Sequence, residues 1–147
     1  MSKSTTSSVF LDVNVWLALS TRDHQHFAPA WSWYTGVPPE TVLTFCRFTQ
    51  LSYLRLLTTQ SVMGKGTLSQ TEAWQAYDQW IEAAGAELIG EPLGVEFGFR
   101  LKSSGMLASP KEWADAYLAA FAEAGGLTLV TFDRALAGKV KGAVVLG

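Results

Sequence analysis

Two short apolar runs, one near each end of the chain, stop abruptly on an aspartate. Residues 9–11 are Val-Phe-Leu and lead to Asp12, and residues 127–132 are Leu-Thr-Leu-Val-Thr-Phe and lead to Asp133. Each run suits a short buried strand, and a helical pattern starts directly after each aspartate. If both strands lie in one parallel sheet, both carboxylates emerge at its carboxyl edge, where open α/β sheets bind ligands. The two runs therefore predict an α/β fold with an acidic crevice.

Strand and helix patterns alternate between these runs. We expect strands over residues 8–11, 41–44, 86–89, 127–132 and 143–146. We expect helices over residues 13–19, 25–34, 45–58, 92–101 and 110–124, one more starting near residue 67 or 69, and a short one after residue 133. This alternation predicts a three-layer fold with a central, mainly parallel sheet flanked by helices and joined by right-handed crossovers.

Length and composition favour one domain. The chain has 147 residues, of which 48% are hydrophobic, enough for a single core over residues 9–147. Residues 1–8 are small and polar, so we expect a flexible tail there and no secretory signal. No apolar stretch is long enough to span a bilayer. The expected class is a soluble cytoplasmic protein without membrane association.

Charge and cysteine content exclude two simple readings. The formal net charge of −2 gives no overall basic footprint for nucleic acid, so any attraction of phosphates would be local. Cys46 is the only cysteine, which rules out an intramolecular disulfide. Its apolar surroundings suggest a small core residue in a reducing compartment.

A third aspartate lies in an otherwise apolar helix. Residues 109–112, Ser-Pro-Lys-Glu, carry a cap serine, a first-turn proline and a glutamate at the third position, which mark the start of that helix. Asp115 follows, and a buried charge needs a partner. Asp12, Asp115 and Asp133 would repel one another if they converge, unless a divalent cation lies between them. Oxygen ligands without clustered His or Cys suit Mg²⁺ or Mn²⁺.

Four blocks of this sequence resemble the PIN-domain ribonucleases, in particular the VapC-type toxins of bacterial toxin–antitoxin pairs. The blocks are residues 11–17, 44–58, 113–118 and 130–134. They follow the family's order with compatible spacing, and the resemblance extends over the chain from residue 9 onward.

The resemblance implies an activity and a set of site residues. The activity is that of a Mg²⁺- or Mn²⁺-dependent endoribonuclease that cuts cellular RNA and is held inactive by a cognate antitoxin protein. Asp12, Asp115 and Asp133 would be the catalytic, metal-binding acids, with Asn14 and Thr131 orienting them. A homodimer is expected by analogy with the family.

One position departs from the family pattern. Gln50 occupies the place where the family usually has a glutamate. An amide oxygen can bind a metal but carries no charge and cannot act as a general base, so metal affinity is expected to fall by roughly 10–100-fold. Water would then be activated by metal and an aspartate. Arg47, three residues earlier, could hold a phosphate at the same crevice; solvent exposure or a structural ion pair accounts for it equally well.

Each acid also has a structural interpretation. Asp12 and Asp133 could be ordinary helix N-caps, and Asp115 could pair with Arg100 or Arg134. Three acids in the context of the four blocks favour the metal site over these readings.

Two other functions remain open from the sequence. One is a PIN-like module that binds RNA or protein without cutting, because Gln50 has weakened the site. The other is a haloacid-dehalogenase-like phosphatase, which needs a second aspartate where this chain has Asn14 and a small hydroxyl residue where it has Trp16.

The aromatic residues raise a separate question. Of the six tryptophans, Trp16, Trp74 and Trp113 fit core-facing positions. Residues 31–34, Trp-Ser-Trp-Tyr, crowd one helix end and cannot all point inward. We expect there either a protein interface, such as a homodimer seam or an antitoxin groove, or an inert aromatic cluster.

Overall fold

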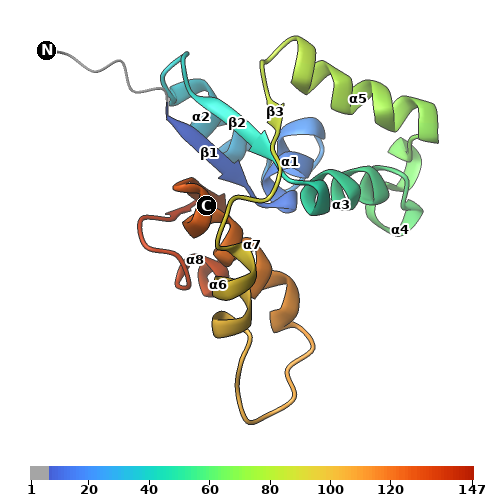
Figure 1. The fold of residues 1–147 in the computed structure, drawn as a ribbon. Coiled ribbons are helices and arrows are strands. Elements are labelled where there is room, and N and C mark those ends of the chain that lie inside the picture. The colour runs from blue at the N-terminus through green and yellow to red at the C-terminus, as the bar shows by residue number, and fades with distance from the viewer. Residues whose placement is uncertain (1–6) are drawn as a thin grey trace, which may run out of the picture.

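The structure, a computed structural model, describes residues 7–147 and folds them into one sheet with helices packed around it (Figure 1). The elements in chain order are β1 (Ser8–Leu11), α1 (Val13–Ser20), α2 (Phe27–Gly36), β2 (Val42–Phe45), α3 (Arg47–Leu57), α4 (Gln60–Met63), the 3-10 helix η1 (Gly64–Gly66), α5 (Gln70–Glu82), β3 (Glu87–Leu88), α6 (Val95–Lys102), α7 (Glu112–Gly125), β4 (Thr128–Thr131), α8 (Arg134–Ala137) and β5 (Val144–Val145). Among the helices described, none is long and apolar enough to cross a membrane.

The sheet has five parallel strands in the order β3-β2-β1-β4-β5. The predicted α/β architecture with a central parallel sheet is therefore confirmed. Because β1 lies at the centre and pairs with β4, Leu11 stands opposite Val130. The ladder continues one residue further, since the Asp12 amide donates to the Val130 carbonyl at 3.0 Å. The carboxyl ends of the first and last long strands thus meet, as the two aspartate-terminated runs predict.

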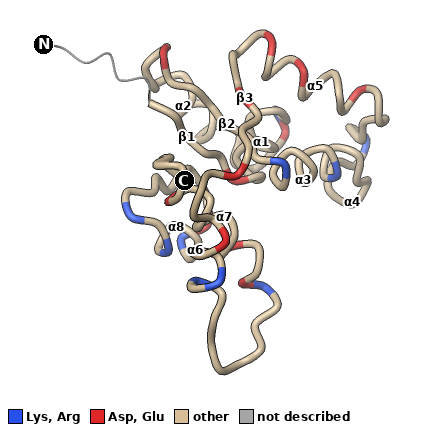
Figure 2. The backbone as a smooth tube through the Cα atoms, viewed as in Figure 1, with Lys and Arg blue, Asp and Glu red and all other residues tan. Residues whose placement is uncertain are grey.

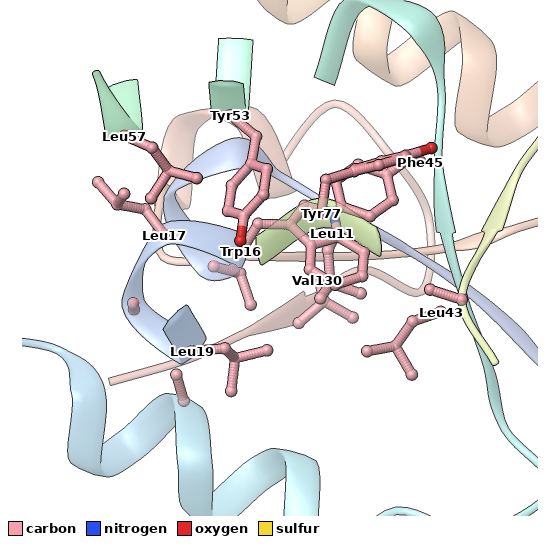
Figure 3. Close-up of a cluster of buried hydrophobic side chains, with 14 of the residues drawn as sticks. Leu11, Trp16, Leu17, Leu19, Leu43, Phe45, Tyr53, Leu57, Tyr77 and Val130 are labelled. Atoms are coloured by element: carbon pink, nitrogen blue, oxygen red, sulfur yellow. The ribbon is translucent and has the colours of Figure 1, made fainter. Parts of the chain in front are cut away.

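Both faces of the sheet are buried at its centre, which explains why β1 is apolar from Val9 to Leu11. On one face, the fully buried Trp16 of α1 stacks on Phe45 of β2 with ring centroids 3.8 Å apart, and Tyr53 of α3 packs beside them (Figure 3). On the other face, Phe10 of β1 stacks on Phe121 of α7 at 4.8 Å. Each such side chain contributes roughly 1.5–3 kcal/mol through burial. The two cores fix α1 and α7 against the sheet, and so fix the helices that carry the candidate site.

Some boundaries differ from the sequence prediction. The second strand ends at Phe45 and α3 starts only at Arg47, because Cys46 takes the cap position and its amide donates to the Thr49 hydroxyl at 2.9 Å. The helix expected from Pro110 begins at Glu112, because Ser109 bonds to the Glu112 side chain instead of capping the backbone. Helix α4 was not expected at all.

The predicted tail over residues 1–8 lies mostly outside the described residues, which begin at residue 7. Ser8 is already the first residue of β1. The Ser7 carbonyl accepts a hydrogen bond from the Val42 amide at 2.9 Å, so the ordered ladder extends to the start of the described chain.

Two of the three tryptophans predicted to face the core do not. Trp16 is fully buried, but Trp74 is 47% exposed and Trp113 is 58% exposed. Trp74 lies on the exposed side of α5, and Trp113 lies in the exposed first turn of α7, ahead of the buried stretch over residues 116–122. Trp113 stands at the base of an arm, formed by α6, residues 103–111 and the start of α7, that projects away from the sheet (Figure 1).

Candidate active site

Asp12 is a buried carboxylate with both oxygens engaged. It caps α1, with Oδ1 accepting from the Val13 amide at 2.8 Å, and Oδ2 accepts from the Thr131 hydroxyl at 2.8 Å. Only 7% of the residue is exposed. Burial raises the pKa of Asp12, and these two hydrogen bonds partly oppose the rise. Its cap and its contact with β4 coexist, so the structural interpretation of this residue does not exclude a functional one.

Thr131 joins the two aspartates that end the apolar runs. The same hydroxyl that donates to Asp12 accepts from the Asp133 amide at 2.9 Å. Thr131 is fully buried at the end of β4, and its hydroxyl both donates and accepts a hydrogen bond. This one hydroxyl therefore contacts the residue that follows β1 and the amide of the residue just beyond β4. The pairing of the two strands thus sets where Asp12 and Asp133 lie relative to each other.

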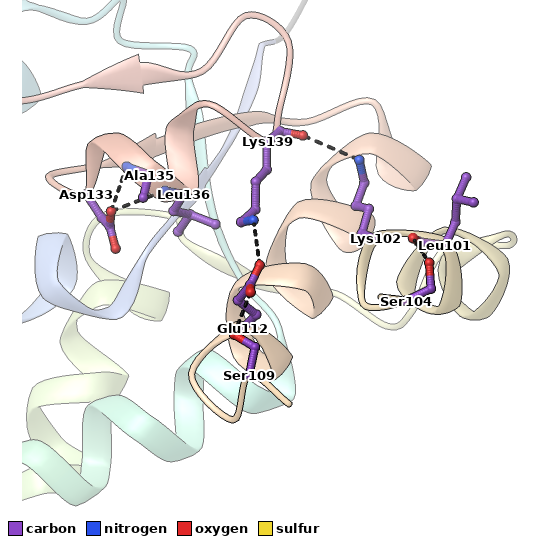
Figure 4. Close-up of polar contacts among 9 residues, drawn as sticks. All are labelled: Leu101, Lys102, Ser104, Ser109, Glu112, Asp133, Ala135, Leu136 and Lys139. Carbon is purple, nitrogen blue, oxygen red and sulfur yellow. Dashed lines mark hydrogen bonds and ion pairs between the residues drawn. The ribbon is translucent and has the colours of Figure 1, made fainter. Parts of the chain in front are cut away.

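Asp133 is exposed and caps α8. Its Oδ1 accepts from the Ala135 amide at 2.8 Å and the Leu136 amide at 3.2 Å (Figure 4). Within residues 7–147, no hydrogen bond uses Oδ2. One oxygen of this carboxylate is therefore fixed by the helix and the other is available to a ligand.

Asp115 lies half-buried in the first turn of α7. Burial raises its pKa, the Asp133 carboxylate raises it further, and the Lys139 ammonium partly offsets both effects. The carboxylates of Asp115 and Asp133 also contribute to the raised pKa of Asp12. The three acids predicted from the sequence are thus close enough to feel one another's charge, although they come from positions spread over most of the chain.

The three acids influence one another's charge, but their side chains do not surround one common point. Within residues 7–147, no three Asp, Glu, His or Cys side chains are arranged to hold one ion directly. Asp12 and Asp133 are each held by the cap of a different helix. The donor chemistry suits Mg²⁺, which usually retains several waters and binds only one or two carboxylates directly. A partly hydrated hard cation therefore fits these oxygens better than a fully dehydrated one.

The other side of the crevice carries Arg47 and Gln50 at the start of α3. Gln50 is buried, and its Oε1 accepts from Arg47 Nη1 at 2.5 Å. The amide of Gln50 also lies against the Tyr77 hydroxyl and limits the rise in the pKa of Tyr77 that burial causes. Among the described residues, no hydrogen bond joins Gln50 to any of the three aspartates.

The neighbours of the acids exclude the ion-pair interpretation of Asp115. Among residues 7–147, Asp115 has no ion pair with an arginine, and Arg100 pairs instead with Glu96 at 2.7 Å. Glu112 bonds to Ser109 and, at 3.3 Å, to Lys139 (Figure 4), and its charge also contributes to the raised pKa of Asp115. Asn14 is exposed, and no hydrogen bond within the described chain connects it to the acids.

Two neighbours of the site were not singled out for this role by the sequence. Lys139 follows α8 and brings a positive charge to Asp115, a contact that no helical spacing predicts. Tyr117, one half-turn beyond Asp115, donates to Glu91 at 2.6 Å, and burial, with this bond adding to it, raises the pKa of Tyr117. Glu91 comes from the segment after β3, so it also arises at the carboxyl edge of the sheet.

The family model of the PIN domain matches residues 9–141. The chain is also 42% identical over 128 residues to Ribonuclease VapC41 of Mycobacterium tuberculosis, covering 84% of this chain and 88% of that protein. The chain therefore belongs to the PIN-domain family and, within it, to the VapC ribonucleases. The family resemblance carried by the four sequence blocks is confirmed.

Two solved structures share the fold. The toxin VapC20 of Mycobacterium tuberculosis, which cleaves the sarcin–ricin loop, has a TM-score of 0.58 and 15% identity, covering 88% of this chain and 93% of that one. VapBC2 of Rickettsia felis, bound to a DNA fragment from its promoter, has a TM-score of 0.63 and 11% identity, covering 94% and 96% of the two chains. At these identities the likeness concerns the fold alone.

Proposed function

We propose that this VapC-family ribonuclease is the toxin of a toxin–antitoxin pair and cuts cellular RNA at a divalent cation held by Asp12, Asp115 and Asp133. The observation that carries the proposal is the hydrogen-bonded bridge from Asp12 through Thr131 to Asp133, with the charge of Asp115 acting on both acids. A carboxylate whose pKa is raised by burial, and further by two neighbouring carboxylates, is a poor structural element but a good ligand for a cation.

The cation, Mg²⁺ or Mn²⁺, would neutralise the acids, polarise the scissile phosphate and lower the pKa of a bound water. Asp12, Asp115 and Asp133 would hold it, directly or through its waters, and the unused Oδ2 of Asp133 would also orient the attacking water and accept its proton. The water oxygen would then bond to phosphorus as the bond to the leaving ribose oxygen breaks, and the leaving oxygen would take up a proton from solvent. Thr131 would keep Asp12 in position, and Asn14 would support the acids from the first turn of α1.

Gln50 and Arg47 would act on the RNA side of the site. The hydrogen bond between them supports an indirect part for Gln50, which holds the guanidinium in place. Arg47 is exposed at the same sheet edge, directly after β2, where its charge is not cancelled by the neutral amide. A guanidinium in that position is suited to a phosphate oxygen of the bound strand.

The partners follow from the family. VapC toxins pair with VapB antitoxins, and the Rickettsia felis VapBC2 structure is a neighbour of this fold. We propose a cognate antitoxin protein, RNA as substrate, a homodimer, and action in the cytoplasm, where cellular RNA is found.

Cleavage of total RNA by the purified protein tests the proposal. We expect discrete fragments with Mg²⁺ or Mn²⁺, none with chelator, and none with Asp133→Asn. Asp78→Asn, an exposed acid on α5, is the matched control and should cut normally. Metal-independent cleavage, or full activity of Asp133→Asn, would contradict the assignment.

A binding module without nuclease activity is the second candidate, favoured by the neutral Gln50 and by the open spacing of the acids. Calorimetry separates the two. Binding of Mn²⁺ that Asp12→Asn abolishes supports the nuclease, whereas a folded protein that binds neither Mg²⁺ nor Mn²⁺ at millimolar concentration supports the inert module.

A further inference from the structure

The half-buried ammonium of Lys139 lies near the candidate acids and has a weak partner. Its Nζ approaches the partly exposed carboxylate of Glu112 at 3.3 Å (Figure 4). The two other ion pairs formed by the described residues are shorter, at 2.7 and 2.9 Å. An ammonium can donate three hydrogen bonds, and within residues 7–147 this one has a single acceptor. Lys139 therefore keeps the capacity to bind a further anionic group.

The backbone of Lys139 is held more firmly than its ammonium. Its amide donates to the Leu136 carbonyl at 3.0 Å, and its carbonyl accepts from Lys102 Nζ of α6 at 3.3 Å. The next residue, Val140, is buried. The bond to Glu112 joins two partly exposed groups, and such ion pairs contribute little to stability. The side chain can therefore exchange this carboxylate for another anion at small cost, while its base stays in place.

Lys139 and Arg47 stand on opposite flanks of the acids. Arg47 follows β2 directly, and Lys139 follows β4 and α8; β2 and β4 are the two strands that flank β1. Basic side chains of residues 134–141 gather near α6 and α8, whereas the charged residues of α5 are all acidic (Figure 2). An RNA strand that crosses the acids would thus meet a cation on each flank.

The charge of Lys139 also acts on Asp115, where it offsets part of the repulsion from the other carboxylates. A divalent cation at the acids would perform the same task with twice the charge, and it would repel the ammonium. The ammonium would then favour an anion that arrives from outside. The phosphates of the RNA strand are such anions.

We propose that Lys139 is a substrate-binding residue that yields its place beside Asp115 to the divalent cation and binds an oxygen of the RNA phosphate that meets the acids. The inference rests on the proposed function and adds a cationic contact to the same site. It gives one charge two opposite effects, because Lys139 favours RNA binding and opposes cation binding. A lysine that only stabilised the fold would favour both.

RNA binding tests the first effect. Lys139→Met keeps the length of the side chain and removes its charge. In chelator at about 0.1 M salt, its affinity for a labelled single-stranded RNA should fall by about fivefold, whatever the RNA sequence. The slope of log affinity against log salt concentration should become shallower by about 0.7, the value for one phosphate contact on a single strand. Lys139→Arg should keep both values, and so should Lys65→Met, which alters an exposed lysine of η1.

Calorimetric titration with Mn²⁺ tests the second effect. Lys139→Met should bind Mn²⁺ about two- to fivefold more tightly than wild type, because the competing charge is gone. Lys139→Arg and Lys65→Met should match wild type.

Three results would overturn the inference. The first is an unchanged RNA affinity or salt slope in Lys139→Met. The second is a loss of affinity for both RNA and Mn²⁺ together with a lower unfolding temperature, which would give Lys139 a structural role. The third is an equal loss of RNA affinity in Lys65→Met, which would mean that general charge and not this site attracts the strand. A wild-type chain that binds no Mn²⁺ would overturn the proposed function as well, so the two failures are distinguishable.

Discussion

The two halves of the sheet's carboxyl edge are built in different ways. On the half formed by β1 and β4, the Thr131 hydroxyl bonds to Asp12 and to the Asp133 amide, so the strands themselves place the acids. On the half formed by β2 and α3, Arg47 and Gln50 bond to each other along one helix. The first half is a contact between distant parts of the chain, and the second is a local pair three residues apart.

This difference separates two tasks. Carboxylates that repel one another need a rigid frame, and adjacent parallel strands provide it because their spacing is fixed by backbone hydrogen bonds. A guanidinium that meets a flexible RNA strand needs only local support from its own helix. In our interpretation, the first half performs the chemistry and the second positions the substrate.

The largest effect is expected for Asp12→Asn. Removing this charge should reduce RNA cleavage by more than the roughly 10–100-fold typical of residues that only support a metal ligand. The asparagine can still accept from the Val13 amide, so the cap of α1 should persist and thermal unfolding should change little. Rates on a purified RNA substrate, measured beside the Asp78→Asn control, test this expectation. Cleavage within a few fold of wild type would remove Asp12 from the chemistry.

A smaller effect, on both stability and cleavage, is expected for Thr131→Val. This change keeps the shape of the side chain and removes the hydroxyl that links Asp12 to the Asp133 amide. Asp12 would lose a hydrogen-bond donor in a buried place, at a cost of about 1–3 kcal/mol in the free energy of unfolding. Cleavage should fall by roughly 10–100-fold, because the acids lose their common support. Denaturant unfolding and RNA cleavage measure the two effects separately. Thr128→Val, at the other end of β4, is the matched control and should affect neither strongly.

The sequence predicts the first half well. Buried parallel strands read as short apolar runs, and an aspartate directly after each run must emerge at the same edge, so the approach of Asp12 and Asp133 follows from pattern alone. The proximity of Asp115 needed one more assumption, that its helix returns to β4. Family resemblance singled out Thr131, and the structure adds the atoms that it joins.

The sequence predicts the arm and the local pair less well. Trp113 fits a helical face, but whether that face meets the core depends on where α6 lies, which no local pattern encodes. Helix α7 starts later than predicted where the Ser109 hydroxyl bonds to the Glu112 side chain. The sequence does not show whether that hydroxyl bonds to this side chain or to a backbone amide of the first turn. The bond between Arg47 and Gln50 is different, since their i,i+3 spacing on a helix would have allowed the prediction.

Substitution of Gln50 by glutamate tests the division between the two halves. The new carboxylate would replace the amide oxygen beside Arg47 and form a partly buried ion pair there. We therefore expect the affinity for Mn²⁺ to change by less than about threefold, because the added charge is cancelled locally. Calorimetric titration measures it, with Gln75→Glu on the exposed face of α5 as the control. A rise of tenfold or more in the affinity for Mn²⁺, absent in the control, would mean that position 50 belongs to the metal site and that the two halves do not have separate tasks.

The smallest effect concerns stability and pH. The pKa of Asp115 is raised in the folded state, so its protonated form favours folding, and this contribution is lost as pH rises through the raised pKa. Asparagine resembles the protonated form. Without metal at neutral pH, Asp115→Asn should therefore be more stable than wild type by a few tenths to about 1 kcal/mol, a modest value because the group is only half-buried. Near pH 3, below the ordinary pKa of an aspartate, the difference in stability between the variant and wild type should vanish.

Saturating Mg²⁺ should reverse the order of stability, because only the wild-type carboxylate gains from binding the cation. Urea unfolding at the two pH values, with and without Mg²⁺, measures all three differences. If the variant is less stable than wild type at neutral pH without metal, Asp115 is held by attractive contacts and does not share in the repulsion among the acids.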